Sequence, residues 1–234
     1  MNIKMDSLQL VLFTNSLDIS DKLKLAQEVQ AFNKVKLDGE PIVLPLPQDA
    51  PLEIPRIMLK NKTGNINVNI APSRTDIFLL DNPATQQGIQ NNDLDKIGEE
   101  AIPIGIDVFN VITNKYSANV HRSAIVVKLI VELDMDSKDF LQKTLFVKRK
   151  DSPHEMKAGL LFKTVIASKF KVNKWINFES LRGKVDPTKA TALSFSVDIN
   201  SQPEVDYKFN NITLTAYFSE AYKEILSAIK YHIG

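Results

Sequence analysis

Two stretches of the chain follow the same pattern at a spacing of 116 residues. SLQLVLFTNSLDISDKLKLAQ begins at Ser7, and SAIVVKLIVELDMDSKDFLQK begins at Ser123. Each is a run rich in strand-forming residues that ends in Leu-Asp, followed by a residue able to cap a helix and then by an amphipathic segment. A duplication changes how every later motif is interpreted, so it is considered first. The pattern predicts a chain made of two related halves.

Each copy is predicted to place a helix after its strand. Ser20 is expected to cap the first helix and Asp136 the second, because these side chains accept hydrogen bonds from the free amides of a first turn. Residues spaced for one helix face are Leu25, Val29 and Phe32 in the first copy, and Phe140 and Leu141 in the second. The two copies therefore agree in the order of their elements.

The rest of each half is predicted to hold further strands and a final helix. Alternation of apolar and polar residues predicts strands at 65–70, 75–80, 193–199 and 210–218. Apolar residues three and four apart predict a helix over 92–114, which Pro103 should kink or divide because its ring removes a backbone donor. A closing helix, capped by Ser219, is expected to run to the end of the sequence.

These elements predict an α+β fold of two pseudo-repeats, 1–116 and 117–234, each built as strand, helix, antiparallel strands, helix. The helices are expected to pack on one face of a largely antiparallel sheet. The repeats would form one compact unit or two tightly packed subdomains. In its topology this order is similar to the duplicated saddle of the TATA-box-binding protein family. The similarity implies neither that family's ligand nor its binding residues.

The segment GEPIVLPLPQDAPLEIPRIML, at 39–59, holds five of the eleven prolines. It lies inside the first copy, whereas a linker between domains belongs between the copies. Its many apolar residues are too numerous for a solvated polyproline ligand, although PLPQDAP has the composition of one. The segment is therefore predicted to be an edge or crossover segment packed against the sheet.

The amino-acid composition excludes several kinds of site and indicates where the protein is expected to work. The absence of cysteine excludes disulfides, thiol catalysis and Cys-containing metal sites, and it suits a reducing compartment, so we expect a cytoplasmic protein. No apolar run approaches the roughly 20 residues that span a bilayer, and the N-terminal run lacks a small-residue cleavage site, so we expect neither a membrane partner nor a signal peptide. The net charge of +1 indicates no general attraction to nucleic acid.

Positive charge is nevertheless concentrated in one region. Between 138 and 184 there are twelve Lys or Arg against four Asp or Glu, an excess of +8, so the remaining residues sum to −7. Within SKFKVNKWINFES, strand alternation places lysines and the only tryptophan on the face opposite the apolar residues. The candidate binding residues are Lys148, Arg149, Lys150, Lys163, Lys169, Lys171, Asn173 and Trp175, and Lys157 would extend the same positive surface.

Three interpretations of this segment remain open. Lysines beside an exposed aromatic side chain suit backbone phosphates and a stacked base, which favours nucleic acid. The same surface suits an acidic protein partner. Lysines at outward positions also protect strand edges and need no ligand, and Lys174 on the inward face allows a bulge that would turn Trp175 inward.

Catalytic and metal-binding patterns are weak. His121, His154 and His232 lie far apart in the sequence, without the spacing that places two ligands on one helix face. Asp134 with Asp136, and Asp93 with Asp95, resemble paired oxygen ligands but are better explained as helix caps and first-turn charges. The standard phosphate-binding and nucleophile motifs do not occur. We therefore expect no cofactor, metal or catalytic residue.

Three functions follow from these features. The first is a non-enzymatic binding or adaptor protein, with a duplicated sheet scaffold and a basic second half that faces an acidic partner. The second is a nucleic-acid-binding protein that uses the face from Lys169 to Trp175. The third is an enzyme with a site at the junction of the two repeats.

Overall fold

The computed structural model describes residues 1–15, 17–32, 37–47, 49–80, 94–145, 156–181 and 191–234, apart from the side chain of Asp95. Nine strands and four helices are formed there. In chain order they are β1 (Asn2–Thr14), α1 (Lys22–Phe32), β2 (Ile42–Val43), β3 (Ile57–Lys60), β4 (Ile66–Ile70), β5 (Arg74–Leu80), α2 (Leu94–Asn114), β6 (Val120–Glu132), α3 (Ser137–Leu145), β7 (Lys157–Ile166), β8 (Phe170–Leu181), β9 (Ala192–Ser201) and α4 (Asn211–Ile233).

All nine strands belong to one antiparallel sheet, with the order β2-β3-β4-β5-β1-β6-β9-β8-β7. The long strands β1 and β6 lie side by side in the middle, and their paired residues run from Asn2 opposite Glu132 to Thr14 opposite Val120. Residues from both halves of the sequence therefore form a single sheet. The fold is α+β, as the sequence predicts.

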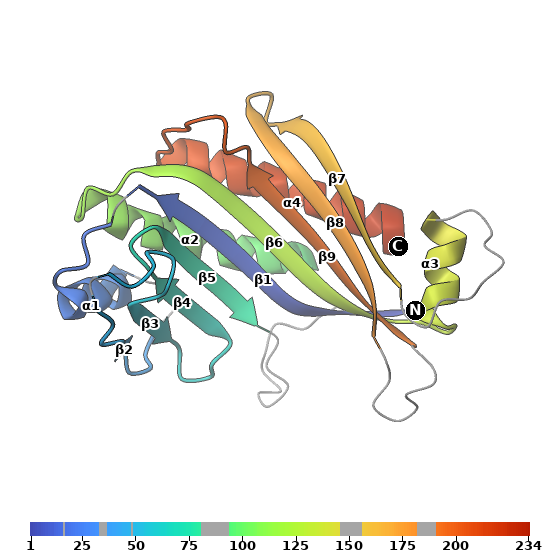
Figure 1. The fold of residues 1–234 in the computed structure, drawn as a ribbon, viewed down its shortest axis with the longest axis horizontal. Coiled ribbons are helices and arrows are strands. Elements are labelled where there is room, and N and C mark those ends of the chain that lie inside the picture. The colour runs from blue at the N-terminus through green and yellow to red at the C-terminus, as the bar shows by residue number, and fades with distance from the viewer. Residues whose placement is uncertain (16, 33–36, 48, 81–93, 146–155, 182–190) are drawn as a thin grey trace.

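The two long helices α2 and α4 pack against one face of this sheet and against each other (Figure 1). Strand alternation directs Leu8, Leu10 and Leu12 toward that face, and all three are fully buried. The core lies between the sheet and these helices, and it includes Ile125 and Val127 of β6. None of the helices in the described residues is long and apolar enough to cross a membrane.

Helix α4 starts earlier than the sequence predicts. The run 210–218 was expected to be a strand, but α4 begins at Asn211, and Ser219 lies within it rather than at its cap. The side chain of Asn210 accepts a hydrogen bond from the Thr213 amide (2.9 Å), and the Thr213 hydroxyl accepts one from the Asn210 amide (2.8 Å). This reciprocal cap favours a helix over a strand, and Leu214, with the buried residues that follow at helical spacing, packs on the core.

Two other helices differ from expectation in smaller ways. The cap of α1 is Asp21, whose carboxylate accepts a hydrogen bond from the Lys24 amide (3.0 Å), whereas Ser20 precedes it. Helix α2 runs without interruption through Pro103. In α3 the predicted cap is present, because Asp136 accepts a hydrogen bond from the Lys138 amide at 3.0 Å.

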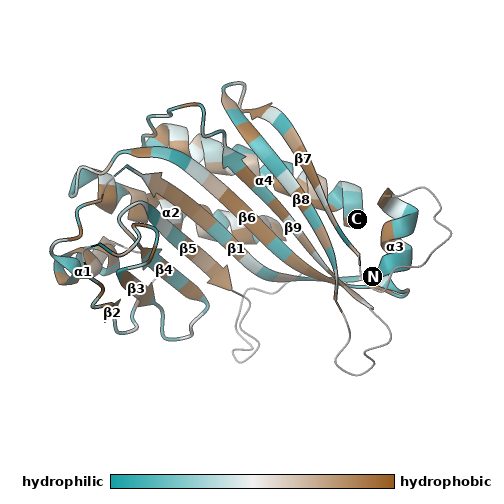
Figure 2. Ribbon diagram, in the orientation of Figure 1, coloured by the Kyte–Doolittle hydropathy of each residue, from teal (hydrophilic) through white to brown (hydrophobic). Residues whose placement is uncertain are grey.

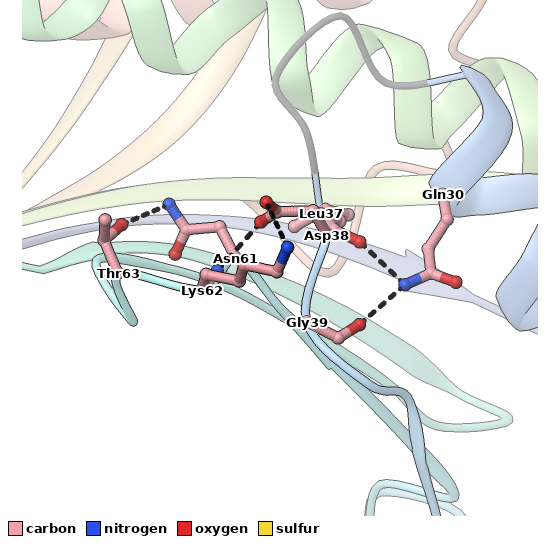
Figure 3. Close-up of polar contacts among 7 residues, drawn as sticks. All are labelled: Gln30, Leu37, Asp38, Gly39, Asn61, Lys62 and Thr63. Carbon is pink, nitrogen blue, oxygen red and sulfur yellow. Dashed lines mark hydrogen bonds and ion pairs between the residues drawn. The ribbon is translucent and has the colours of Figure 1, made fainter.

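The proline-rich segment enters the sheet beside the strand β3. Gln30 of α1 donates to the carbonyls of Leu37 (2.7 Å) and Gly39 (3.0 Å), while Asp38 accepts a hydrogen bond from the Lys62 amide (2.9 Å; Figure 3). A side chain at position 39 would place its Cβ 2.7 Å from the Lys60 carbonyl oxygen, so glycine permits this approach. The segment then forms β2, an edge strand, in keeping with its predicted role.

Candidate binding face

The face of the sheet opposite α2 and α4 is the candidate site, and we call it the open face. Its residues follow from the strand pairing, because paired residues of antiparallel strands point to the same side. One row across the sheet reads Asp76, Val11, Ala124, Asn200, Asn173 and Lys163, and the next reads Phe78, Gln9, Val126, Asp198, Trp175 and Leu161. Polar and apolar side chains alternate along the strands that form it (Figure 2).

Trp175 lies on the open face in the part formed by β7 and β8. It pairs with Leu161 of β7, and Val165 lies further along the same strand. The three side chains are 39%, 44% and 53% exposed, respectively. Trp175 and Leu161 are direct neighbours, whereas Lys163 lies between Leu161 and Val165 on the same face. Exposed apolar side chains grouped on one face mark interaction sites more often than scattered ones do. We call these three residues the apolar patch.

The orientation of Trp175 depends on how Lys174 is accommodated. Lys174 points toward the helix side, where its ammonium group lies 3.1 Å from the Glu224 carboxylate of α4 and 5.5 Å from the centre of the Phe162 ring. The ion pair lets a lysine occupy an inward position at the border of the helix layer. The pairing of β8 with both neighbours is continuous, without a bulge, and Trp175 therefore stays on the open face.

The structure brings several of the predicted binding residues together. Lys163 pairs with Asn173 beside the apolar patch, and Lys171 pairs with Val165. Lys169 lies in the turn between β7 and β8, with its ammonium group 4.9 Å from the centre of the Phe170 ring. Lys157, further along β7, is paired with Glu179 at 3.5 Å. Lys148, Arg149 and Lys150 lie outside the described residues.

A second group on the open face was missed from the sequence. Phe13 of β1 lies between two guanidinium groups, with that of Arg122 4.7 Å and that of Arg74 5.4 Å from the ring centre. Both distances fit cation–π contacts. Phe13 is an outward aromatic residue on a strand whose inward positions are leucines. Trp175 was identified as an aromatic residue at an outward strand position, and Phe13 has the same feature. The sequence therefore contained a signal that could have identified Phe13.

Hydrogen bonds hold the two arginines in place. Arg74 reaches Asp76 through Nη2 at 2.7 Å, and the same carboxylate accepts a hydrogen bond from Gln9 at 2.7 Å. On the other side of Phe13, Arg122 donates to the Ser201 carbonyl at 3.1 Å and to Asn200 at 3.3 Å. Side chains from both halves of the chain thus converge in one polar group.

Asp198 lies next to the apolar patch, because it pairs with Trp175 across β8 and β9. Burial raises its pKa above the ordinary value, against the opposing effects of a hydrogen bond from Asn200 and the charges of Arg122 and Arg74. The hydrogen bond from Asn200 measures 3.1 Å. The open face is therefore mixed in charge rather than uniformly basic.

A hollow of about 320 Å³ lies on the same face, beside the apolar patch. It is lined by Lys128, Lys157, Asn177, Glu179, Ser194 and Ser196. The two lysines are paired with carboxylates, Lys128 with Asp6 at 3.3 Å and Lys157 with Glu179 at 3.5 Å. The hollow thus offers hydroxyl, amide and paired ionic groups to a partner.

The two histidines among the described residues, His121 and His232, form no common site. His232 packs edge-on against Phe178, with ring centres 5.6 Å apart, and burial and the charge of Lys174 lower its pKa. His121 has an enclosed Nδ1 without a hydrogen-bond partner, and His154 lies outside the described residues, as does Asp93. Within the described residues, no three His, Asp or Glu side chains are grouped as metal ligands.

Comparison of the chain with protein-family models, curated proteins and solved structures finds no match. The site is therefore interpreted from its geometry alone.

Proposed function

We propose that the protein is a binding or adaptor protein that recognises an acidic protein partner with the open face of its sheet. The observation that carries the proposal is the apolar patch of Trp175, Leu161 and Val165 beside lysines. Tryptophan contributes more binding energy than most residues at protein interfaces, above all where surrounding residues exclude water from it. An antiparallel sheet needs only one face for its core, so the other face is available for recognition.

The lysines near the patch support an acidic partner. Among the described residues, Lys163, Lys169 and Lys171 form no ion pair, whereas Lys157 and Lys174 are each paired with a glutamate. Of these three lysines, Lys163 and Lys171 lie beside the patch, and Lys169 lies in the adjoining turn between β7 and β8. Charges at the rim of an interface increase the association rate and select partners of opposite sign.

Nucleic acid is the second candidate, because Trp175 offers a ring for base stacking next to lysines. Asp198 lies opposite Trp175, and Glu179 lies on the same face of β8, beyond Trp175 with Asn177 between them. Negative charges at these positions oppose the continuous charge of a phosphate backbone. A protein surface can instead place carboxylates near the lysines and neutral or basic groups near Asp198 and Glu179. We therefore favour the protein partner. The third candidate, an enzyme with a site at the junction of the halves, remains a prediction.

We also propose that the two halves are pseudo-repeats. The support is the equivalent order of pairing on either side of the central strands: β1 pairs with β5 and then β4 follows, while β6 pairs with β9 and then β8 follows. Each half also ends in a long helix, α2 or α4. The similarity to the TATA-box-binding protein saddle stays a prediction about topology.

Site-specific crosslinking tests the proposed face. A photoreactive phenylalanine analogue is incorporated at position 175 of the full chain, and crosslinking is carried out in the cells that express it. The same analogue at position 231 is the control. Tyr231 is 83% exposed on α4, away from the open face. We expect a defined protein adduct from position 175 that is absent from position 231. Equal adducts from both positions, or nucleic acid as the main adduct, would contradict the proposal.

The identified partner is then measured with purified proteins. Affinity is measured by calorimetry for every variant, and in the native chain the fluorescence of Trp175, its only tryptophan, also reports on the open face. Removal of a central tryptophan typically costs at least about 2 kcal/mol, so Trp175→Ala should weaken binding about thirtyfold. Tyr231→Ala should leave affinity unchanged. An unchanged affinity for Trp175→Ala would refute the role of the patch.

A further inference from the structure

Arg56 is a buried cation without a charged partner. Its residue is 4% exposed, and it stands immediately before β3, where its backbone amide donates to the Ile70 carbonyl at 2.8 Å. The guanidinium Nη2 donates to the Ala50 carbonyl at 2.8 Å and lies 3.5 Å from that of Pro51. Nη1 is enclosed and has no hydrogen-bond partner. Among the described residues, Arg56 forms no ion pair with a carboxylate.

This arrangement is unusual on physical grounds. Arginine is almost never fully buried unless it is paired, because removing its charge from water carries a large penalty. The carbonyls of Ala50 and Pro51 offset part of that penalty and fix the proline-rich segment in place. They supply no negative charge. An anion bound next to Arg56 would supply it.

Arg56 lines a cavity of about 370 Å³, which has room for a small ligand. Leu17, Ile19, Leu46 and Leu52 form apolar parts of its wall. They come from the segment between β1 and α1 and from the proline-rich segment. The cavity thus combines a buried cation with a surface suited to a hydrocarbon group.

The charged side chains in the cavity wall, Arg56 included, have one positive charge in excess. Lys22, at the first position of α1, and Arg56 are positive, and Asp18 is negative. The Asp18 carboxylate is already engaged by the Ser20 amide at 2.9 Å, and this hydrogen bond lowers its pKa. The N-terminus of α1 adds nothing to this balance, because the Asp21 carboxylate already caps it. A ligand with one negative charge would complete the site.

We propose that this cavity binds a carboxylate that carries an apolar substituent. The carboxylate pairs with Arg56 and Lys22, and the substituent packs on the leucines of the wall. A planar guanidinium matches a carboxylate in geometry as well as in charge. A free apolar acid and the C-terminal carboxylate of a peptide share this chemistry. The site lies entirely within the first half of the chain. It is separate from the open face.

Matched pairs of ligands test the proposal by calorimetry and thermal stability with the full chain. N-acetyl-leucine is compared with N-acetyl-leucinamide, which has the same shape but no charge. Ala-Ala-Leu is compared with its C-terminal amide. We expect each acid to bind and to raise the melting temperature, and each amide to bind at least about tenfold more weakly. Tighter binding of the tripeptide identifies a peptide terminus as the source, and tighter binding of N-acetyl-leucine identifies a free acid.

Three variants connect binding to the cavity. Arg56→Met and Lys22→Met should each weaken binding of the acids, by at least about tenfold for Arg56→Met. Leu52→Ala should weaken binding through the substituent, and Leu52 is exposed enough that the fold does not depend on it. Lys62→Met is the control, because it removes the same charge from an exposed turn outside the cavity.

Two results would overturn the proposal. One is equal binding of acids and amides, or no binding of either. The other is unchanged acid binding in both Lys22→Met and Leu52→Ala. These two variants keep the test decisive if Arg56→Met fails to fold, since Arg56 also holds the carbonyls of the proline-rich segment.

Discussion

Tyr217 connects helix α4 to the middle of the sheet, and its hydroxyl provides a sensitive test of the packing described here. The side chain is fully buried, and the hydroxyl donates to the carbonyls of Ser123 (2.8 Å) and Ile199 (3.1 Å). Burial raises the pKa of Tyr217 well above its ordinary value, so the hydroxyl keeps its proton. Ser201 joins the same group, because its hydroxyl lies 3.2 Å from the Ser123 carbonyl.

Tyr217→Phe removes the hydroxyl and leaves the ring, which contacts Phe170 and Phe209 at ring-centre distances of 5.4 and 5.5 Å. The apolar packing is therefore retained. Loss of a buried hydrogen bond with its acceptors left in place costs about 1–3 kcal/mol. Because Ser201 still serves the Ser123 carbonyl, we expect a loss in the lower part of that range, about 1.5 kcal/mol. For a chain of this size the melting temperature should fall by about 3 to 6 °C.

Urea unfolding, followed by circular dichroism and by Trp175 fluorescence, measures the effect. Tyr231→Phe is the matched control, because Tyr231 is 83% exposed. Loss of its hydroxyl should change the free energy of unfolding by less than about 0.5 kcal/mol. Tyr217→Phe combined with Ser201→Ala should be non-additive by about 0.5 kcal/mol or more, because both hydroxyls share one carbonyl. Equal effects of Tyr217→Phe and Tyr231→Phe, or strict additivity, would refute this reasoning.

Two further predictions concern the open face and the contact between the long helices. Asp198→Asn should stabilise the protein at neutral pH, because the raised pKa of Asp198 means that its ionisation opposes folding. The gain should be absent below the unfolded pKa of about 3.8, grow as pH rises from there to the raised folded pKa, and stay constant above it, as denaturation at several pH values would show. A constant gain at all pH values would contradict this prediction. Gly98→Ala should destabilise by about 1–2 kcal/mol, because the new Cβ would lie 2.3 Å from the Tyr222 ring, which is held by a hydrogen bond to the Leu94 carbonyl. Gly105→Ala is the comparison in the same denaturation assay, where the clash is with a terminal methyl of Leu10 that can rotate, and a smaller loss from Gly98→Ala than from Gly105→Ala would refute the packing argument.

Local sequence patterns predicted most of the strands, because strand alternation is visible wherever one face is buried. The strands β4, β5, β8 and β9 lie where alternation placed them. The failure at 210–218 has a clear physical cause. That run alternates in polarity, but Leu214, Tyr217 and Phe218 also have helical spacing, and the cap formed by Asn210 and Thr213 decides between the two.

The position of the candidate sites depends on contacts that no local pattern contains. Phe13 meets Arg74 and Arg122 only because β1 lies between β5 and β6. The isolation of Arg56 likewise depends on how the proline-rich segment folds back over it. Sequence identified the residues that stand out within one strand, such as Trp175. It could not identify Phe13, whose two arginine partners lie about 60 or more residues away. Nor could it identify Arg56, whose cavity wall also includes residues from the segment between β1 and α1.

The proposed duplication allows equivalent strands of the two halves to be compared on the open face. Strands β4 and β8 occupy equivalent places in the sheet order, each two strands away from the central pair of β1 and β6. On the open face, β4 presents Asn67 and Asn69, whereas β8 presents Lys171, Asn173 and Trp175. The scaffold accepts either set, since the core depends only on the inward residues. We therefore expect the aromatic and basic residues of β8 to be unnecessary for folding, and this expectation is the strongest reason to propose a binding role for them.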